Sequence, residues 1–293
     1  MQSPATGNTG KVITSKLLEE GHKVRAIGRS SERLAPLVEK GAEPHIGSIE
    51  DVQFLTETFT GADAVYAMIP PDFTAEKFRS YQNQIGEHLA AAIEKSGVKR
   101  VVFLSSMAAH LSDKTGPIAG LHDVEERLNK LQGVDILHLR PTFFMENLFE
   151  GIGTIKNMGV NGSAIQGDIP FAMIATHDIG DYAARRLSKL NFSGKSAQEL
   201  LGPRDLTMQE ATSILGKAIG KSDLEYVQFS YEDTDKAVQS IGFTPDGART
   251  YIDLAKGLNE GIVKGLEERS QENTTPTSLE DMGKFFAMAY EAS

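Results

Sequence analysis

The chain has 293 residues, 40% of them hydrophobic and 24% charged, and its formal net charge is −10. This length allows a well-buried core and suits a dinucleotide-binding domain with a smaller appendage. A chain this acidic is repelled by nucleic acid and by anionic lipid, so we expect neither as a partner. The absence of cysteine excludes disulfides and thiolate metal sites. We expect a cytoplasmic protein without membrane insertion, because no apolar run has membrane-spanning length and no signal peptide is recognisable.

The first half of the sequence alternates short apolar strands with helices. Apolar spacing, capping residues and terminating glycines predict helices over residues 12–20, 31–40, 51–59 and 78–96 and a helical stripe over 121–131, with Ser31 capping the second. Strands are predicted at 23–27, 44–46, 64–69, 101–104 and 136–139, the last of them stopped by Pro141. Apolar strands that do not alternate, separated by helices, indicate an α/β fold with a Rossmann-type, doubly wound parallel sheet.

The second half is less regular. Helices are predicted over 179–190, 207–220, 247–266 and 279–290, a strand over 226–229 and a polar loop over 270–278. Thr207 and Glu210 have the spacing of a capping box. We therefore predict a dinucleotide-binding domain in residues 1–150, to which residues 170–190 return. A smaller α+β substrate-side domain is predicted in residues 151–293.

A glycine turn runs directly into the first helix, in the segment Ala5-Thr-Gly-Asn-Thr-Gly10. Gly7 lets the backbone approach a pyrophosphate, and Gly10 lets the helix pack closely on a sheet. The free N–H groups and the positive dipole of the helix start attract phosphate. The alternative is an ordinary tight turn, and the helix, strand and Arg that follow favour the phosphate site.

An arginine stands where NAD-selective folds carry an acidic residue, about twenty positions after the glycines. This is Arg29, at the end of the strand predicted at residues 23–27, with Arg33 one helical turn later. A guanidinium attracts the 2′-phosphate of NADP bidentately, whereas a carboxylate there would repel it. The cofactor is therefore predicted to be NADP. The alternative is that both arginines are solvated surface residues.

Several motifs together resemble the NmrA-like atypical short-chain dehydrogenases. They are the glycine turn, Gly28-Arg-Ser30, residues 47–51 (GSIED), Ser105-Ser106, residues 139–147 (LRPTFFMEN) and residues 202–210 (GPRDLTMQE). The resemblance covers nearly the whole chain, and within the family the chain is most similar to the NAD(P)H:quinone oxidoreductase type 2 branch.

The resemblance implies roles for individual positions. Gly7, Asn8, Thr9 and Gly10 would hold the pyrophosphate and Arg29 the 2′-phosphate. Ser48 falls where relatives often carry an Asp beside the adenine, a departure that puts this side-chain contact in doubt. Met68, Ile69, Pro70 and Ser105 would flank the nicotinamide ribose, and Phe143 would lie near the nicotinamide.

Conventional short-chain dehydrogenases need Tyr-x-x-x-Lys, in which the Tyr hydroxyl exchanges a proton with the substrate and the Lys lowers its pKa. No Tyr here has Lys four residues later, and the nearest pattern, Tyr182 with Arg186, is more typical of a packed helix. Alcohol dehydrogenase and epimerase chemistry are therefore disfavoured. At the corresponding helix His122 and Glu126 share a face, so His122 is a candidate proton donor that Glu126 orients. The alternative is a solvated helix start.

Quinone reduction requires the protein to position the quinone in an apolar slot, because the cofactor itself performs the chemistry. Phe143, Phe144 and Met107 are candidates for lining that slot, or they are ordinary core packing. We expect an NADPH-dependent oxidoreductase that reduces quinones or similar conjugated carbonyls. The rival hypothesis is a non-catalytic NADP(H)-binding redox sensor with a regulatory protein partner, and a scaffold is a third. A homodimer is compatible with each. No histidines are spaced as metal ligands, so no metal is predicted.

The start of the chain departs from a Rossmann sheet of order 3-2-1-4-5-6, whose first strand lies in the middle. Only Met1-Gln-Ser-Pro4 precede the turn, and proline cannot donate to a central ladder. We therefore expect the first strand to be missing, and the natural protein to have roughly five more residues upstream, rich in Val, Ile or Leu. The alternative is a stub with a tolerated gap.

Overall fold

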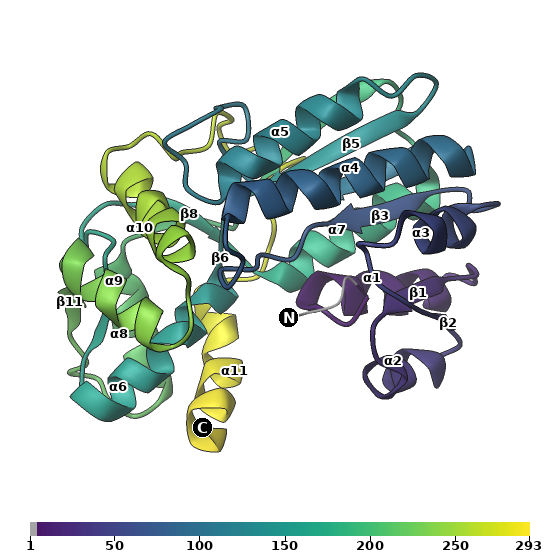
Figure 1. The fold of residues 1–293 in the computed structure, drawn as a ribbon. Helices are drawn as coiled ribbons and strands as arrows, with labels where there is room; N and C mark the ends of the chain where they lie inside the picture. The colour runs from purple at the N-terminus through teal and green to yellow at the C-terminus, as the bar shows by residue number, and fades with distance from the viewer. Residues whose placement is uncertain (1–4) are drawn as a thin grey trace.

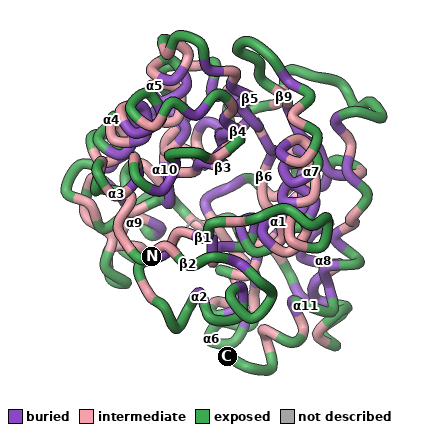
Figure 2. Tube along the Cα trace, turned by 90° about the vertical axis from the view of Figure 1, so that its right-hand side faces the viewer, coloured by how far each residue is buried: buried purple, intermediate pink, exposed green. Residues whose placement is uncertain are grey.

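Two parallel sheets form the centre of the protein in a computed structural model, which describes residues 5–293. The smaller sheet pairs β1 (Arg25–Gly28) with β2 (Glu43–Ile46). The larger sheet has the order β3 (Val65–Met68), β4 (Arg100–Leu104), β5 (Asp135–Pro141) and β9 (Lys195–Leu200), and every pair in it is parallel. The predicted parallel sheet is thus confirmed, and its buried strands pass through the middle of the molecule (Figure 2).

The two sheets are not joined by a strand within residues 5–293. The order 3-2-1-4-5-6 puts the first strand between β1 and β3, where the described residues leave the ladder interrupted. The prediction of a missing first strand concerns residues 1–4, which lie outside the described residues.

Helices cover both faces of the larger sheet (Figure 1). On one face lie α3 (Val52–Phe59), α4 (Phe78–Ser96) and α5 (Ile118–Asn129), whose apolar side chains share a buried cluster with β3, β4 and β5. On the other face, α1 (Asn8–Glu19) and α7 (Thr176–Lys189) pack on the same strands. The short α2 (Ser31–Val38) packs on β1 through Leu34 and Leu37. This is the doubly wound arrangement that the sequence predicts.

The second half of the chain adds small sheets and further helices around another buried cluster that includes Met145, Leu215 and Phe286. Its short strands are β6 (Phe143–Phe144), β7 (Asn161–Ser163), β8 (Phe171–Ile174), β10 (Asp205–Leu206) and β11 (Tyr226–Gln228). Its helices are η1 (Met145–Gly151), α6 (Ile152–Met158), α8 (Met208–Ala218), α9 (Tyr231–Ser240), α10 (Pro245–Asn259) and α11 (Leu279–Ala292). The division into two domains at residue 150 stays a prediction.

Several predicted boundaries are corrected by the structure. Ser30, rather than Ser31, caps α2, because its side chain accepts a hydrogen bond from the Arg33 N–H. The helix predicted to reach residue 266 ends at Asn259, followed by Gly261 with φ of 68°. The strand over 136–139 is not the last of its sheet, since β9 pairs with its far side. The capping box of Thr207 and Glu210 is confirmed.

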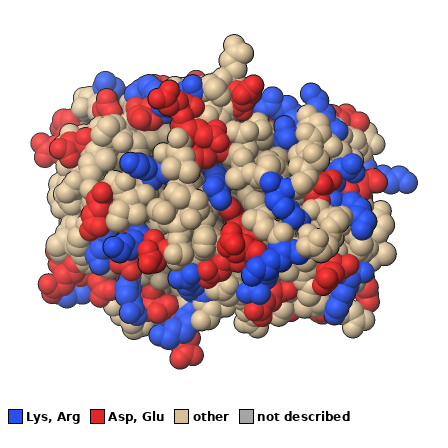
Figure 3. Space-filling model, turned by 90° about the horizontal axis from the view of Figure 1, so that it is seen from above, with Lys and Arg blue, Asp and Glu red and all other residues tan. Residues whose placement is uncertain are grey.

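The face formed by α4 and α5 carries acidic and basic side chains interspersed (Figure 3). Two of its arginines are paired across the helices, Arg79 with Asp123 and Arg127 with Glu87. Among the helices of residues 5–293, none has the length and apolar character needed to cross a membrane.

His138 is buried in β5, and its Nε2 lies 2.8 Å from Asn129 Oδ1. Burial lowers its pKa to about 4. The unfolded chain takes up a proton near pH 6.5, whereas the folded chain stays neutral at this ring, so stability is lost as the pH falls from about 6.5 toward 4. We expect His138 to contribute a loss of up to about 1.4 kcal/mol per pH unit in this window.

Urea unfolding at a series of pH values, with His138→Gln beside the unsubstituted chain, measures this contribution. The glutamine amide still donates to Asn129 but does not titrate, so the variant should lose less stability on acidification. Identical pH slopes for the two proteins would contradict the assignment.

Candidate functional site

The carboxyl ends of the parallel strands bring most of the predicted site residues to one edge. Met68, Leu104 and Leu139 are in register across β3, β4 and β5. The residues that follow them, 69–70, 105 and 140–143, therefore lie beside one another. In open α/β sheets this edge is where ligands bind.

Helix α1 begins at Asn8, with Gly7 as an N-cap whose backbone is extended and which offers no capping side chain. The first N–H groups of a helix have no intrahelical partner, so this end presents donors and a positive dipole. Gly7 and Gly10 are buried and Asn8 is exposed. The residues present thus fit the phosphates of a dinucleotide.

Thr9 ties this helix start to the larger sheet. Its hydroxyl lies 2.9 Å from the Tyr66 hydroxyl on β3, and Thr9 is only 4% exposed. Burial raises the pKa of Tyr66, so the phenol stays protonated. Helix α7 also approaches α1 closely at Gly180, where an added Cβ would lie 2.7 Å from the Val12 Cβ. The helix start is therefore held by contacts with both β3 and α7.

The residues predicted at the adenosine end follow the smaller sheet. Arg29 comes directly after β1 and is exposed, and Arg33 is exposed on α2. Ser48 follows β2, and its hydroxyl accepts a hydrogen bond from the Glu50 N–H. From α4, Tyr81 lies near enough for the charge of Arg29 to lower its pKa, although burial and nearby acidic groups raise that pKa to about 12 overall. Tyr81 is thus a neighbour of the predicted 2′-phosphate site.

The residues predicted at the nicotinamide end include one with a buried hydroxyl, Ser105. Ser105 is 3% exposed, and its side-chain oxygen has no hydrogen-bond partner within residues 5–293. An unsatisfied buried hydroxyl is costly, and a bound ligand would satisfy it. Ile69 and Pro70 are buried, and Met68 is half-buried.

Phe143 and Phe144 face opposite sides, as their alternation predicts. The Phe143 ring contacts Phe171 edge-on at 5.4 Å and packs on the cluster of the second half of the chain, which also contains Met107. Phe144 packs instead on the cluster beneath α1 and α7. Phe143 and Met107 are therefore the pair that share a side.

His122 lies on α5, and its ring is oriented by the Ala109 carbonyl rather than by Glu126, as was predicted. Its Nδ1 lies 2.9 Å from the Ala109 carbonyl oxygen, in the segment that follows Ser105. Glu126 is exposed and is not its hydrogen-bond partner. With Nδ1 donating to a carbonyl, Nε2 is the position left for other contacts. The catalytic role of His122 stays a prediction.

Tyr182, the nearest match to Tyr-x-x-x-Lys, lies on α7 under two guanidinium groups. Arg185 and Arg186 stand 5.5 and 6.0 Å from its ring centroid. The residue packs on the α1 and α7 side of the sheet rather than beside Ser105. Residues 5–293 contain no cluster of His, Cys, Asp or Glu suited to a metal ion.

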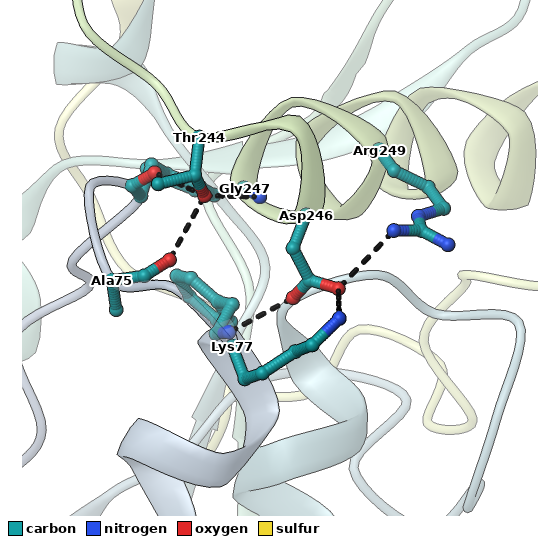
Figure 4. Close-up of polar contacts among 8 residues, drawn as sticks. Ala75, Lys77, Thr244, Asp246, Gly247 and Arg249 are labelled. Carbon is teal, nitrogen blue, oxygen red and sulfur yellow. Dashed lines mark hydrogen bonds and ion pairs between the residues drawn. The ribbon is translucent and has the colours of Figure 1, made fainter.

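The loop that leaves β3 is fastened to α10 (Figure 4). The Thr244 N–H donates to the Phe73 carbonyl at 3.1 Å, and its hydroxyl donates to the Ala75 carbonyl at 2.9 Å. Asp246 accepts a hydrogen bond from the Phe78 N–H at 2.9 Å and so caps α4, whose own N-cap, Lys77, provides no capping bond. The second half of the chain thereby fixes a loop that begins at Ile69 and Pro70.

Two residues of this region, Tyr66 and Tyr81, belong to no motif and were not predicted. Tyr66 is recognised by its contact with Thr9, and Tyr81 by the charge of Arg29. Alternation along β3 is the one available signal, since it puts Tyr66 on the face opposite Val65 and Ala67.

Comparisons with known proteins agree with this architecture. The model of the NmrA-like family matches residues 4–270. The (4-alkanoyl-5-oxo-2,5-dihydrofuran-3-yl)methyl phosphate reductase of Streptomyces griseus subsp. griseus is 27% identical over 92% of this chain and 90% of its own. The NADPH-dependent quinone oxidoreductase QOR2 of Escherichia coli, solved with NADPH, has a TM-score of 0.79 at 21% identity, covering 97% of this chain and 98% of its own. Triphenylmethane reductase of Citrobacter sp., solved with NADP(H), has a TM-score of 0.80 at 18% identity with the same coverage.

Proposed function

The chain belongs to the NmrA-like family, and on that premise we propose that it is an NADPH-dependent reductase of quinones or similar conjugated carbonyls. The observation that carries this proposal is the helix start at Gly7–Gly10 followed by Arg29 at the end of the next strand. Similar proteins whose names state a reductase activity, two of them solved with NADPH or NADP(H), support it.

The proposed cofactor contacts follow the edge of the sheets. The N–H groups of residues 8–10 bind the pyrophosphate, and Arg29, with Arg33 beside it, binds the 2′-phosphate. Ser105 donates its unpartnered hydroxyl to the nicotinamide ribose or amide. The rest of the cofactor is lined by Ser48, Met68, Ile69 and Pro70, and Phe143 lies against the nicotinamide. When bound, NADPH supplies a hydride to the acceptor.

The chain's own part in the reaction is to position the acceptor and exclude water. Phe143 and Met107 offer an apolar wall on one side of the site. The imidazolium form of His122 is the proposed proton donor: it gives its Nε2 proton to the acceptor oxygen and becomes the neutral ring, while its Nδ1–H stays on the Ala109 carbonyl. A quinone also takes protons from water, so this donor adds rate rather than making the reaction possible.

The test of the proposal is consumption of NADPH by the purified protein in the presence of a panel of quinones. We expect one hydroquinone formed for each NADPH consumed. Tight NADPH binding without consumption in any reaction would overturn the reductase proposal and favour the redox sensor. Absence of nucleotide binding would overturn both.

His122→Ala should lower the rate by about a hundredfold if His122 is the sole proton donor. Single Tyr→Phe variants at Tyr66, Tyr81, Tyr182 and Tyr251 should retain turnover, because Tyr-x-x-x-Lys is absent. Steady-state rates with a neutral quinone, at saturating NADPH, measure both. An unchanged rate for His122→Ala would return that residue to the solvated-surface interpretation. A Tyr variant that binds NADPH but is inactive would overturn the mechanism.

A further inference from the structure

The hydroxyl of Tyr66 contacts the middle of the helix start that is proposed to bind the pyrophosphate. The first hydrogen bond of α1 runs from the Lys11 N–H to the Gly7 carbonyl at 3.1 Å, so the N–H groups of residues 8–10 have no partner within the helix. Thr9 is the central residue of these three, and its hydroxyl lies 2.9 Å from that of Tyr66. A displacement of Thr9 would therefore move all three donors.

Thr9 is held through both its side chain and its backbone. Within residues 5–293, its hydroxyl and that of Tyr66 have only each other as hydrogen-bond partners, and Thr9 is 4% exposed, so this bond is shielded from water. Helices α1 and α7 lie side by side (Figure 1), and an added Cβ at Gly180 of α7 would stand 3.0 Å from the Thr9 carbonyl oxygen. One hydrogen bond from β3 and one close backbone approach from α7 thus fix this residue.

The polar side-chain contacts between the rest of α1 and its neighbours lie at least six residues beyond Thr9 in the described part of the chain. They are Lys40 with Ser15 at 2.9 Å, Lys16 with Asp181 at 2.9 Å and His22, just after the helix, with Ser188 at 2.8 Å. These contacts fasten the far half of the helix. The position of the end that carries the free N–H groups therefore depends on the bond between Thr9 and Tyr66.

Strand β3 connects this helix start to the proposed nicotinamide end. Tyr66 is in register with Val102 of β4, so the ladder of the larger sheet fixes its backbone. Its ring packs, together with Ala64 and Met68, on the buried cluster beneath α1 and α7. Met68, the first of the proposed contacts with the nicotinamide ribose, is only two residues further along the same face, or about 7 Å. One paired strand therefore sets the spacing between the pyrophosphate donors and the nicotinamide end.

We propose that Tyr66 is a positioning residue of the cofactor site: its hydroxyl holds the N–H groups of residues 8–10 where the pyrophosphate requires them. This inference rests on the proposed function, because it takes residues 8–10 as the pyrophosphate site. Tyr66 acts through Thr9 and takes no part in hydride or proton transfer. It should therefore affect every cofactor that carries a pyrophosphate, with or without a 2′-phosphate.

The test is Tyr66→Phe, which removes the hydroxyl and leaves the ring in the core. We expect the dissociation constants of NADPH and NADH to rise by the same factor, about fivefold, the weight of one hydrogen bond between uncharged groups. Adenosine 2′-monophosphate has no pyrophosphate and should bind unchanged. The KM for NADPH should rise with the dissociation constant, while kcat at saturating NADPH is retained. Arg29→Ala should give the opposite pattern, with losses for NADPH and adenosine 2′-monophosphate but not for NADH.

Two further variants complete the experiment. Tyr226→Phe is the matched control, because Tyr226 is likewise half-buried and its hydroxyl donates to the Ile165 carbonyl at 2.6 Å, in the small sheet of β7 and β11. It should change none of the three affinities. Thr9→Val removes the other hydroxyl of the bond and should weaken both dinucleotides as Tyr66→Phe does. The double variant should lose no more than either single one, since the same bond is removed.

Titrations without an acceptor separate this inference from the reductase proposal. Unchanged dissociation constants of both dinucleotides in Tyr66→Phe, an equal loss for adenosine 2′-monophosphate, the same losses in Tyr226→Phe, or additive losses in the double variant would each overturn the positioning role and leave the reductase proposal standing. The expected shifts in binding without turnover of any quinone would leave the positioning role standing and overturn the reductase proposal.

Discussion

Arg29→Ala should weaken NADPH binding by about 1.5–3 kcal/mol, or roughly ten- to a hundredfold, and leave NADH binding almost unchanged. Arg29 lies directly after β1, exposed at the carboxyl end of the strand, where a guanidinium can reach a 2′-phosphate. Hydrogen bonds to a charged phosphate are worth more than neutral ones, and NADH has no 2′-phosphate to lose. The preference for NADPH over NADH should therefore be lost because the affinity for NADPH falls while that for NADH does not.

Two controls sharpen this experiment. Arg29→Lys keeps the charge but not the bidentate geometry, so its affinity for NADPH should lie between that of the unsubstituted protein and that of Arg29→Ala. Arg249→Ala removes an exposed arginine of α10 and should change neither affinity. Titration of each variant with both cofactors gives the dissociation constants. Equal losses for NADPH and NADH would mean that Arg29 acts on the fold or on a shared part of the cofactor.

Arg140→Ala should cost about 3–5 kcal/mol of unfolding free energy, the largest effect on stability that we expect from a single substitution here. Arg140 on β5 contacts the Glu125 carboxylate of α5 twice, from Nε at 3.0 Å and from Nη2 at 2.5 Å. The Glu125 side chain is 3% exposed and that of Arg140 16%. Removing the arginine leaves a buried carboxylate without its cation, whose desolvation is no longer offset.

The double variant Glu125→Leu with Arg140→Met is the matched comparison. It removes both charges and fills their volume, so it should recover most of the loss. Thermal unfolding of the single variant should shift down by roughly 10 °C for a protein of this size. A single variant within about 1 kcal/mol of the unsubstituted protein, or a double variant as unstable as the single one, would show that the pair is not what stabilises this region.

The parts of the fold that the sequence predicts well are those with local causes. The bounds of α4, Phe78–Ser96, are predicted to the residue, because Gly97 ends the helix with a φ of 74°. The capping box of Thr207 and Glu210 also depends on neighbours only a few positions away, whereas α1 begins at Asn8, four residues before its predicted start. Helices and buried parallel strands were therefore recognisable from their periodicity.

The missed elements depend on contacts between distant segments. Strand β9 has a largely polar sequence and an exposed first half, so no apolar pattern marks it, and its pairing with β5 makes it a strand. The start of α4 is predicted correctly, but its cap is not, since Asp246 supplies the cap from 168 positions away. In the candidate site, glycine and arginine motifs are recognisable from spacing, whereas the bond between Thr9 and Tyr66 exists only in the folded chain.

The most direct test of the central claim is a single-turnover reaction in which the protein loaded with NADPH is mixed with menadione. We predict loss of the reduced nicotinamide signal with formation of one hydroquinone per cofactor, and a slower loss when the transferred hydrogen at the nicotinamide C4 is deuterium. Bound NADPH that persists in the presence of menadione and of every other quinone tried would contradict the claim that this chain is a reductase.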